Sequence, residues 1–482
     1  MRLTRSPLLL TFALAFSLTG CMVGPEFVRP STEAAATWNA PKPHGASLGS
    51  MAAWWSQFDD PTVARLVATA EADSPTLAQA SAAIERARAS LQSTEAGLIP
   101  NANAGASVTR SHQDTGTGGA SDVTARSALV DASWEIDLFG KVRRGAQAAQ
   151  ARVDARVDDW HDARVSLAAE VADTYVQYRA CELLVDVYEG ELASVRATDK
   201  ATSELVRAGF TAPAEGALAS ASVASTSSTL IAQRAECDLL VKSLVALTGQ
   251  DEPSLRSMLD AGPRKVPQPT AFQVDAVPAD LIRQRPDVAS LEREAAATSA
   301  EIGVAQADLY PSLSLSGSIS VSASSLVSGT TGWSFGPSIS VPIVDGGRRR
   351  AAVRGAEASY DGAVAAYRQG VRQAVKEVEQ SLVTLDRAAR QTDEAERATR
   401  DYERYLRAIE VKWRAGMENL LTLEQARRTA LAAEVQELAV KRQHVQAWIS
   451  LYKAVGGGWT GGSSTGVAAR STSATPSPLS KD

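Results

Sequence analysis

The sequence contains one structural unit twice, and this duplication constrains the fold more than any other feature. Pro75 and Pro100 stand 25 residues apart, and Pro286 and Pro311 repeat that spacing around a similar stretch rich in Ala, Glu and Arg. Further along, the halves align at a constant offset of 207 residues, which pairs Ile136 with Ile343, Gly140 with Gly347, Arg207-Ala208-Gly209 with Arg414-Ala415-Gly416, and Leu244 and Gly249 with Leu451 and Gly456. Such self-similarity predicts two copies of one supersecondary unit. We place the first repeat at 61–255, the second at 285–456, and a linker at 256–284 between them.

Each copy is predicted to contain two strands, at about 100–112 and 123–138 in the first copy and about 311–323 and 332–344 in the second. Apolar residues alternate there with serines or acidic residues, as in Leu313, Leu315, Ile319 and Val321. This period of two is typical of a membrane β-barrel with a polar lumen, although a half-buried soluble sheet shows the same alternation. Pro337 and Pro342 indicate bulges or strand ends. The polar positions expected to face a lumen are Asp131, Ser133, Glu135, Ser314, Ser316 and Ser318.

Long helices are predicted to follow the strands, because no proline interrupts 141–207 or 346–451. At 1.5 Å per residue the first run reaches about 100 Å if it is continuous. Its apolar residues step by three and four, as in a coiled-coil seam, at Ala168, Val171, Tyr175 and Tyr178, and the seam then slips by three to Cys181. A spectrin-like rod would explain these helices but not the strands.

The N-terminus indicates export. Arg2 and Arg5 precede an apolar run that is too short to span a bilayer, which is the layout of a secretory signal peptide at 1–20. The signal ends in Leu18-Thr19-Gly20-Cys21, which resembles a bacterial lipobox. We expect Cys21 to carry acyl chains, and the segment 21–60 to be anchored by them. An ordinary signal peptide with an incidental cysteine is the alternative.

Composition mainly excludes functions. The formal net charge of -6 argues against nucleic acid as a partner. The four histidines are scattered without metal-ligand spacing, and the sequence shows no phosphate-binding loop and no nucleophile elbow. We therefore expect no metal, no cofactor, no catalytic residues and no enzymatic activity. The Gly/Ser/Thr-rich tail at 457–482 is predicted to be disordered.

Four strands cannot close into a barrel. In lipid, a four-stranded sheet would leave two unpaired edges, and each unsatisfied backbone group there costs several kcal/mol. Closure must therefore come from several copies of the chain. The residues alone do not say how many copies are needed.

Several short motifs resemble the TolC-like outer-membrane factors, and within them the NodT-type lipoproteins of resistance-nodulation-division (RND) efflux systems. Besides the lipobox, the motifs are Val23-Gly24-Pro25 with Arg29-Pro30, Trp54-Trp55 with Phe58 and Asp60-Pro61, Trp134-Glu135 with Asp137-Leu138-Phe139-Gly140, Gly336-Pro337-Ser338-Ile339-Ser340 with Pro342-Ile343, and Asp345-Gly346-Gly347. Their order covers about residues 18–456.

The resemblance implies an α+β membrane protein of the cell outer membrane. Three chains would form a 12-stranded β-barrel, with four strands per chain, continued by a long α-helical barrel in the periplasm. A homotrimer of this kind would be a passive exit duct for small molecules. Its partners would be a periplasmic adaptor protein, an inner-membrane RND transporter and membrane lipid. The alternative within the family is the outer-membrane component of a type I protein secretion system.

The resemblance also implies a gate at the turns after Gly209 and Gly416, where relatives often carry acidic residues that narrow the pore. The candidate gate residues are Glu215, Glu418, Glu424 and Gln425. Relatives often have aspartate at the position of Gln425, and some have arginine at that of Glu418. We therefore expect a milder acidic ring, with Glu215 and Glu424 as its members. The alternative is that these groups are solvated charges at helix ends.

Cys181 and Cys237 lie 28 residues on either side of Gly209. If two antiparallel helices turn there, the cysteines stand at similar heights and can form a disulfide in an oxidising compartment. A turn centred nearer Ala212 would put them out of register. Because Cys181 also falls on the apolar seam, where a free thiol is an ordinary small hydrophobe, the unbridged state is favoured.

Overall fold

The computed structural model describes residues 22–31, 38–42, 51–114, 120–271, 285–325 and 329–459. The signal peptide and Cys21 lie outside these ranges, as does nearly all of the C-terminal tail. The first half contains η1 (Met51–Gln57), α2 (Pro61–Ala72), α3 (Pro75–Glu95), η2 (Ala96–Leu98), β1 (Asn101–Asp114), β2 (Ala120–Ile136), α4 (Lys141–Arg207), α5 (Pro213–Thr248) and α6 (Glu252–Asp260). The second half contains α8 (Pro286–Ala307), β3 (Ser312–Ser324), β4 (Thr330–Ser340), α9 (Arg348–Arg414) and α10 (Leu420–Ala454).

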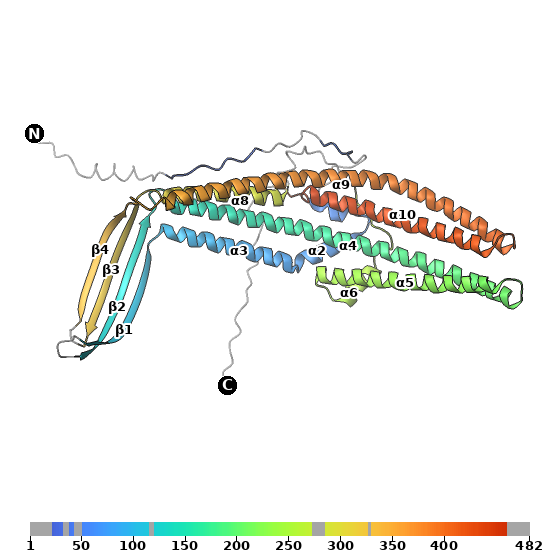
Figure 1. Ribbon diagram of the computed structural model, residues 1–482, viewed down its shortest axis with the longest axis horizontal. Coiled ribbons are helices and arrows are strands. Elements are labelled where there is room, and N and C mark those ends of the chain that lie inside the picture. The colour runs from blue at the N-terminus through green and yellow to red at the C-terminus, as the bar shows by residue number, and fades with distance from the viewer. Residues whose placement is uncertain are drawn as a thin grey trace, which may run out of the picture.

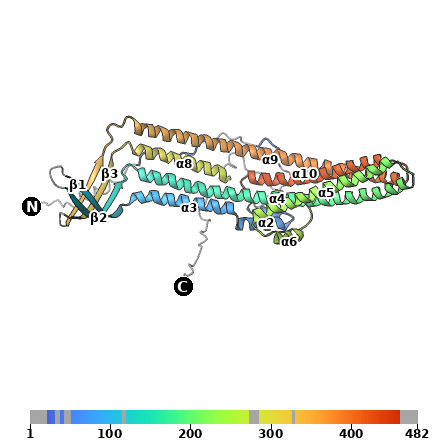
Figure 2. The ribbon, with the colours of Figure 1, turned by 60° about the horizontal axis from the view of Figure 1, so that its bottom comes forward.

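The molecule is a long rod with a sheet at one end (Figure 1). The same order of helix, two strands, long helix and shorter helix occurs in both halves, and α4 and α9 are each 67 residues long. Viewed from another side, the hairpins α4–α5 and α9–α10 again turn at the end of the rod opposite the sheet (Figure 2). The two repeats therefore lie side by side and point the same way.

The four strands form one antiparallel sheet in the order β1-β2-β3-β4. The central pairing of β2 with β3 joins the two repeats, with Ile136 opposite Leu313. In the described chain β1 and β4 each have a single neighbour, so the sheet has two open edges. Pro337 lies inside β4 without breaking the register, which such an edge strand tolerates, and β4 ends at Ser340 before Pro342.

The seam predicted on α4 is buried, and it is extended by a disulfide between Cys181 and Cys237. Their Cα atoms are 5.6 Å apart. The favoured expectation of free thiols is wrong, because the turn between α4 and α5 is centred close to Gly209 and brings the two cysteines to the same height. The bridge fastens the two helices of the first hairpin at the edge of the main hydrophobic core, next to Ala180 of α4 and four residues from Val241 of α5.

The largest hydrophobic core lies near the middle of the rod. Trp54, from the Trp-Trp motif, is 1% exposed and stacks on Tyr452 of α10 with 4.9 Å between ring centroids. Residues of α2, the central part of α4 and the short helix α6 complete this core. Segments from both repeats and from the N-terminal region thus meet at one level.

Candidate functional site

The sheet has one polar face. Asp131, Ser133 and Glu135 of β2 stand directly opposite Ser318, Ser316 and Ser314 of β3. The structure therefore brings all six predicted lumen residues onto the same face. Hydrogen bonds extend the polar rows to the edge strands: Asn103 Nδ2 donates to Asp131 over 3.3 Å, and the hydroxyls of Ser318 and Ser334 are 3.0 Å apart.

The opposite face of the sheet, which we call the apolar face, is uncovered. Trp333 is 78% exposed, Phe335 69% and Ile319 59%. Figure 1 shows that the strands extend beyond the ends of the α-helices, and among the described elements only η2 touches this face, at its base, where Trp134 donates to the Leu98 carbonyl over 3.1 Å. A contiguous exposed patch of large apolar side chains indicates contact with lipid or with another protein.

The hairpin turns at the other end of the rod share one geometry. Gly209 and Gly416 have positive φ angles of 75° and 72°. In the first turn the Phe210 N–H donates to the Leu205 carbonyl over 2.9 Å, and in the second the Met417 N–H donates to the Lys412 carbonyl over 2.9 Å. These are Schellman caps, which need a residue without a Cβ at the left-handed position. They explain why both copies have glycine at this position.

The four candidate gate residues occupy different environments near these turns. Glu215 is half-buried in the first turn of α5 and accepts a hydrogen bond from Thr211 Oγ1 at 3.0 Å. Glu418 lies 4.0 Å from Lys412 Nζ, and the exposed Gln425 accepts from Arg428 at 2.7 Å.

Glu424 is placed differently from these three. It is 7% exposed and is bound by Arg427 at 2.6 Å. Its carboxylate is therefore buried between the helices and is not a solvated charge at a helix end. A signal for this was present in the sequence, because the buried residues Leu420, Leu423, Arg427 and Ala430 follow helical spacing and place position 424 on the same side of α10.

Arg427 joins the two hairpins. Its side chain is 3% exposed and comes from α10, whereas its partners come from three helices. Nη1 lies 2.6 Å from Glu424 on α10, Nη2 lies 3.2 Å from Thr198 Oγ1 on α4 and 3.8 Å from Glu410 on α9, and Nε lies 3.9 Å from Glu191 on α4. We call Arg427, Glu191, Glu410, Glu424 and Thr198 the hairpin clamp.

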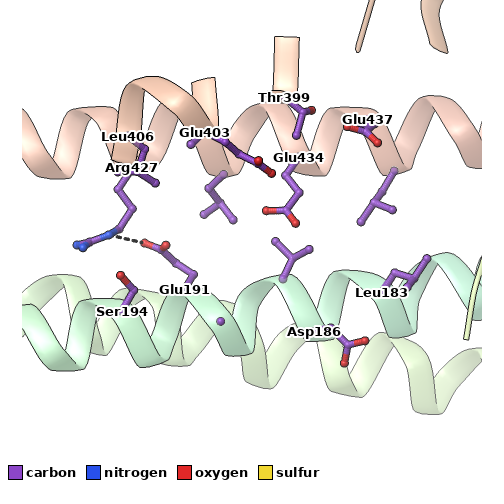
Figure 3. Close-up of a pocket in the computed structure, with 15 residues that line it drawn as sticks. Leu183, Asp186, Glu191, Ser194, Thr399, Glu403, Leu406, Arg427, Glu434 and Glu437 are labelled. Atoms are coloured by element: carbon purple, nitrogen blue, oxygen red, sulfur yellow. Dashed lines mark ion pairs between the residues drawn. The ribbon is translucent and has the colours of Figure 1, made fainter. Parts of the chain in front are cut away.

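The hairpin clamp closes one end of a groove between α4 and the pair α9–α10. In Figure 3, Arg427 and Glu191 extend toward each other from the two sides. The groove holds about 570 Å³ and is lined by leucines and by further carboxylates, among them Glu403 and Glu434. Sequence reasoning did not predict this groove, because its walls lie more than 200 residues apart in the chain.

The clamp holds more negative than positive charge. One guanidinium faces three carboxylates, and Arg427 Nε has no hydrogen-bond partner within the described chain. Burial raises the pKa of Glu191 to about 7, Arg427 opposes that shift, and Glu424, Glu410 and Glu434 add to it. Burial, with the charges of Glu403 and Glu437, also raises the pKa of Glu434. We therefore expect the packing of α4 against α10 to depend on the protonation of Glu191 and Glu434.

The segment that follows Cys21 is held at the base of the sheet. The Val23 N–H donates to the carbonyl of Phe139 over 3.1 Å. The buried Arg144, from the first turn of α4, donates to the carbonyls of Val23 and Gly24 over 3.0 and 3.1 Å. A Cβ on Gly24 would lie 2.4 Å from the Cα of Gly303, so this close contact requires glycine. Cys21 itself lies outside the described residues.

These features define a class of protein. None of the helices in the described ranges has an apolar stretch that could cross a bilayer. The molecule instead combines a two-faced sheet, a long helical rod and a charged clamp at its far end. This combination of sheet and rod is the one found in the solved outer-membrane channel OprN.

The chain belongs to the outer membrane efflux protein family, whose model matches residues 66–250 and 277–457. It is 29% identical to outer membrane protein OprJ of Pseudomonas aeruginosa, over 94% of this chain and 96% of that protein. It is 30% identical to nodulation protein T of Rhizobium leguminosarum bv. viciae, over 70% of each chain. The solved structure of the outer-membrane channel OprN superposes with a TM-score of 0.79 and 30% identity, covering 91% of this chain and all of that one.

Proposed function

We propose that three copies of this chain form the outer-membrane exit duct of a tripartite RND-type efflux pump for small molecules, working with a periplasmic adaptor and an inner-membrane transporter. The observation that carries the proposal is the four-stranded sheet with two open edges and an exposed apolar face. In lipid such edges must be paired, and three copies joined edge to edge supply a closed barrel of twelve strands. The α4–α5 and α9–α10 hairpins would then surround the periplasmic mouth.

The duct can be tested in planar bilayers. We expect the purified protein to form pores that prefer cations, because Glu215 lies in the narrow turn region and a ring of carboxylates selects cations by electrostatics. Glu215→Gln should lower the cation preference in reversal-potential measurements. Ser220→Ala, a neutral change at an exposed position of the same helix, serves as the control. Absence of a pore in the unchanged protein would exclude the duct, whereas a pore with unaltered selectivity would exclude only the role of Glu215.

The orientation of the strands gives a second prediction. We expect the apolar face to contact lipid and the polar face to line the lumen. Single cysteines at Ser316 and at Leu315, which are neighbours on opposite faces of β3, should differ in their reaction with a membrane-impermeant thiol reagent. Ser316→Cys should react faster because water reaches it. Faster labelling of Leu315→Cys would reverse the assignment.

Lipidation gives a third prediction. Arg144 and Gly303 contact Val23 and Gly24 and so hold the start of the mature chain beside the base of the sheet. Acyl chains on Cys21 could enter the membrane from there. Acyl burial contributes about 0.8 kcal/mol per CH₂ group. Cys21→Ser should abolish incorporation of a palmitate analogue in growing cells, with Cys181→Ser as a control that keeps it. Continued labelling of the Cys21 variant would show that the lipid is attached elsewhere.

A further inference from the structure

Charged side chains occupy the tip of the apolar face of the sheet, at the end away from the helices. Even-numbered residues of β1 and β2 share this face, because Val108 pairs with Arg126, Arg110 with Thr124 and His112 with Asp122. Nearer the base, the same rows contain Ala106, Val130, Ala132 and Trp134. We call Arg110, His112, Asp122 and Arg126 the tip patch.

The height of the tip patch matches the edge of a bilayer core. Ile136 marks the base of the apolar face. Arg126 precedes it by ten residues on β2 and lies toward the tip of the sheet. Ten residues at about 3.3 Å each extend about 33 Å along the strand. With the tilt of about 40° found in such barrels, the vertical rise is about 25 Å, which is the height of their apolar band. The arginines therefore begin where hydrocarbon gives way to headgroups.

The tip patch carries unbalanced positive charge. Asp122 is its only acid, and it is shared between Arg110 at 2.8 Å and His112 at 2.7 Å. No carboxylate of the described residues lies within ion-pairing distance of Arg126. Arg110 and Arg126 are diagonal neighbours across the β1–β2 pair, close enough for long side chains to reach one point. Two like charges so placed repel each other unless an anion lies between them.

The charge is confined to half of the sheet. At the height of the tip patch, the β3 residue opposite Arg126 is Ala323. Two residues closer to the base, Val321 of β3 pairs with Thr331 of β4. These side chains are neutral. The patch is therefore a local feature of β1 and β2 and would recur once per chain around a closed barrel.

We propose that Arg110 and Arg126 bind the phosphate group of a membrane lipid headgroup in the leaflet farther from the helices. The proposal rests on the duct orientation proposed above. Guanidinium groups match phosphate oxygens with paired, charge-assisted hydrogen bonds, and such bonds are stronger where water is partly excluded. The apolar rows just below, with Val108 and Val130, would contact the acyl chains of the same lipid. The phosphate supplies the anion that Arg126 lacks within the described residues, and Arg110, which is paired with Asp122, adds a second guanidinium to the same site.

The proposal is tested with the purified full chain in nanodiscs of a neutral, phosphate-free galactolipid that contain a small fraction of bisphosphorylated lipid A. Native mass spectrometry after detergent release counts the lipid A molecules that each protein retains. A charged hydrogen bond contributes about 1.5–3 kcal/mol, so losing both arginines should weaken retention at least about tenfold. The variant is Arg110→Gln with Arg126→Gln. The control, Arg390→Gln with Arg404→Gln, removes two exposed arginines of the helices and should retain the lipid.

Dephosphorylated lipid A should be retained weakly by every form of the protein. Equal retention of the two lipids, or equal retention by the tip-patch variant and the unchanged protein, would overturn the proposal. The single Arg126→Gln variant breaks no ion pair among the described residues. It should therefore show weaker lipid A retention even if the double variant folds poorly. Conductance of the same samples separates this result from the duct: a pore without phosphate-dependent retention contradicts only the tip patch.

Discussion

Replacement of Arg427 by methionine is expected to separate the two hairpins at the end of the rod opposite the sheet. Without the guanidinium, Glu191 and Glu424 lose their described ion-pair partner between the helices, and Glu410 keeps only Arg414 at 3.8 Å. Breaking a buried ion pair by removing one partner typically costs 3–5 kcal/mol. Methionine keeps much of the apolar stem, so the loss reports charge and not a cavity. We expect a larger and noisier single-channel conductance, together with faster amide hydrogen exchange in the tips of α4 and α10.

Arg428→Met is the matched control, because Arg428 is the next residue on α10, is exposed and donates to the side chain of Gln425. It should leave conductance and exchange unchanged. Equal effects of the two variants would mean that the loss of any positive charge near the mouth suffices. No effect of Arg427→Met would show that the clamp does not hold the hairpins.

We expect the hairpin clamp also to make the contact between the hairpin tips sensitive to pH. In the closed state the two hairpins touch through the clamp, as in the structure, and in the open state they have parted. Glu191 has a pKa of about 7 where it is buried and an ordinary pKa once the helices part. The closed state therefore binds more protons than the open one, and its stability falls as pH rises from the ordinary value through about 7. We expect lower conductance at pH 5.5 than at pH 8.5. Glu191→Gln should keep the low conductance across this range and remove most of the pH dependence.

Replacement of Arg179 by methionine is expected to weaken the middle of the rod. Arg179 of α4 is fully buried and donates through Nε to the Tyr175 hydroxyl at 2.7 Å, through Nη1 to Glu182 at 2.6 Å and through Nη2 to the Leu259 carbonyl at 2.7 Å. The Tyr175 hydroxyl in turn donates to the buried Asp60. Loss of this arginine removes three hydrogen bonds at once and leaves the largely buried Glu182 without its ion-pair partner, so we expect local stability to fall by about 3–5 kcal/mol.

Hydrogen exchange measured by mass spectrometry would show the effect as faster exchange in α2 and α6, which Arg179 connects to α4 through Asp60 and Leu259. Arg196→Met, an exposed position on α4, should leave both segments protected. Gly262 offers an independent check, because a Cβ there would lie 2.3 Å from Arg179 Nη2. Gly262→Ala should therefore reproduce part of the loss. Normal protection in Arg179→Met would show that the aromatic core alone holds this level of the rod.

Features with a short sequence period were predictable. Alternation of apolar residues with hydroxyl or acidic residues predicted the strands. It also grouped Asp131 with Ser318 on one face, because successive side chains of a strand point to opposite faces of the sheet. Proline-free stretches predicted α4 and α9, and the spacing of Cys181 and Cys237 about Gly209 put a bridge within reach. These inferences needed only local geometry and chain connectivity.

The sequence by itself determined the duplicated order of elements, the two faces of the strands and the positions of the turns, because each depends on neighbours along the chain. Only the tertiary structure decided which way Glu424 points, that Arg427 faces Glu191, and that Arg144 holds the segment after Cys21. The first two contacts depend on how the two hairpins are rotated against each other. The third depends on how the N-terminal segment lies against α4. That rotation is set by the packing of many side chains together, and no single motif in the sequence records it.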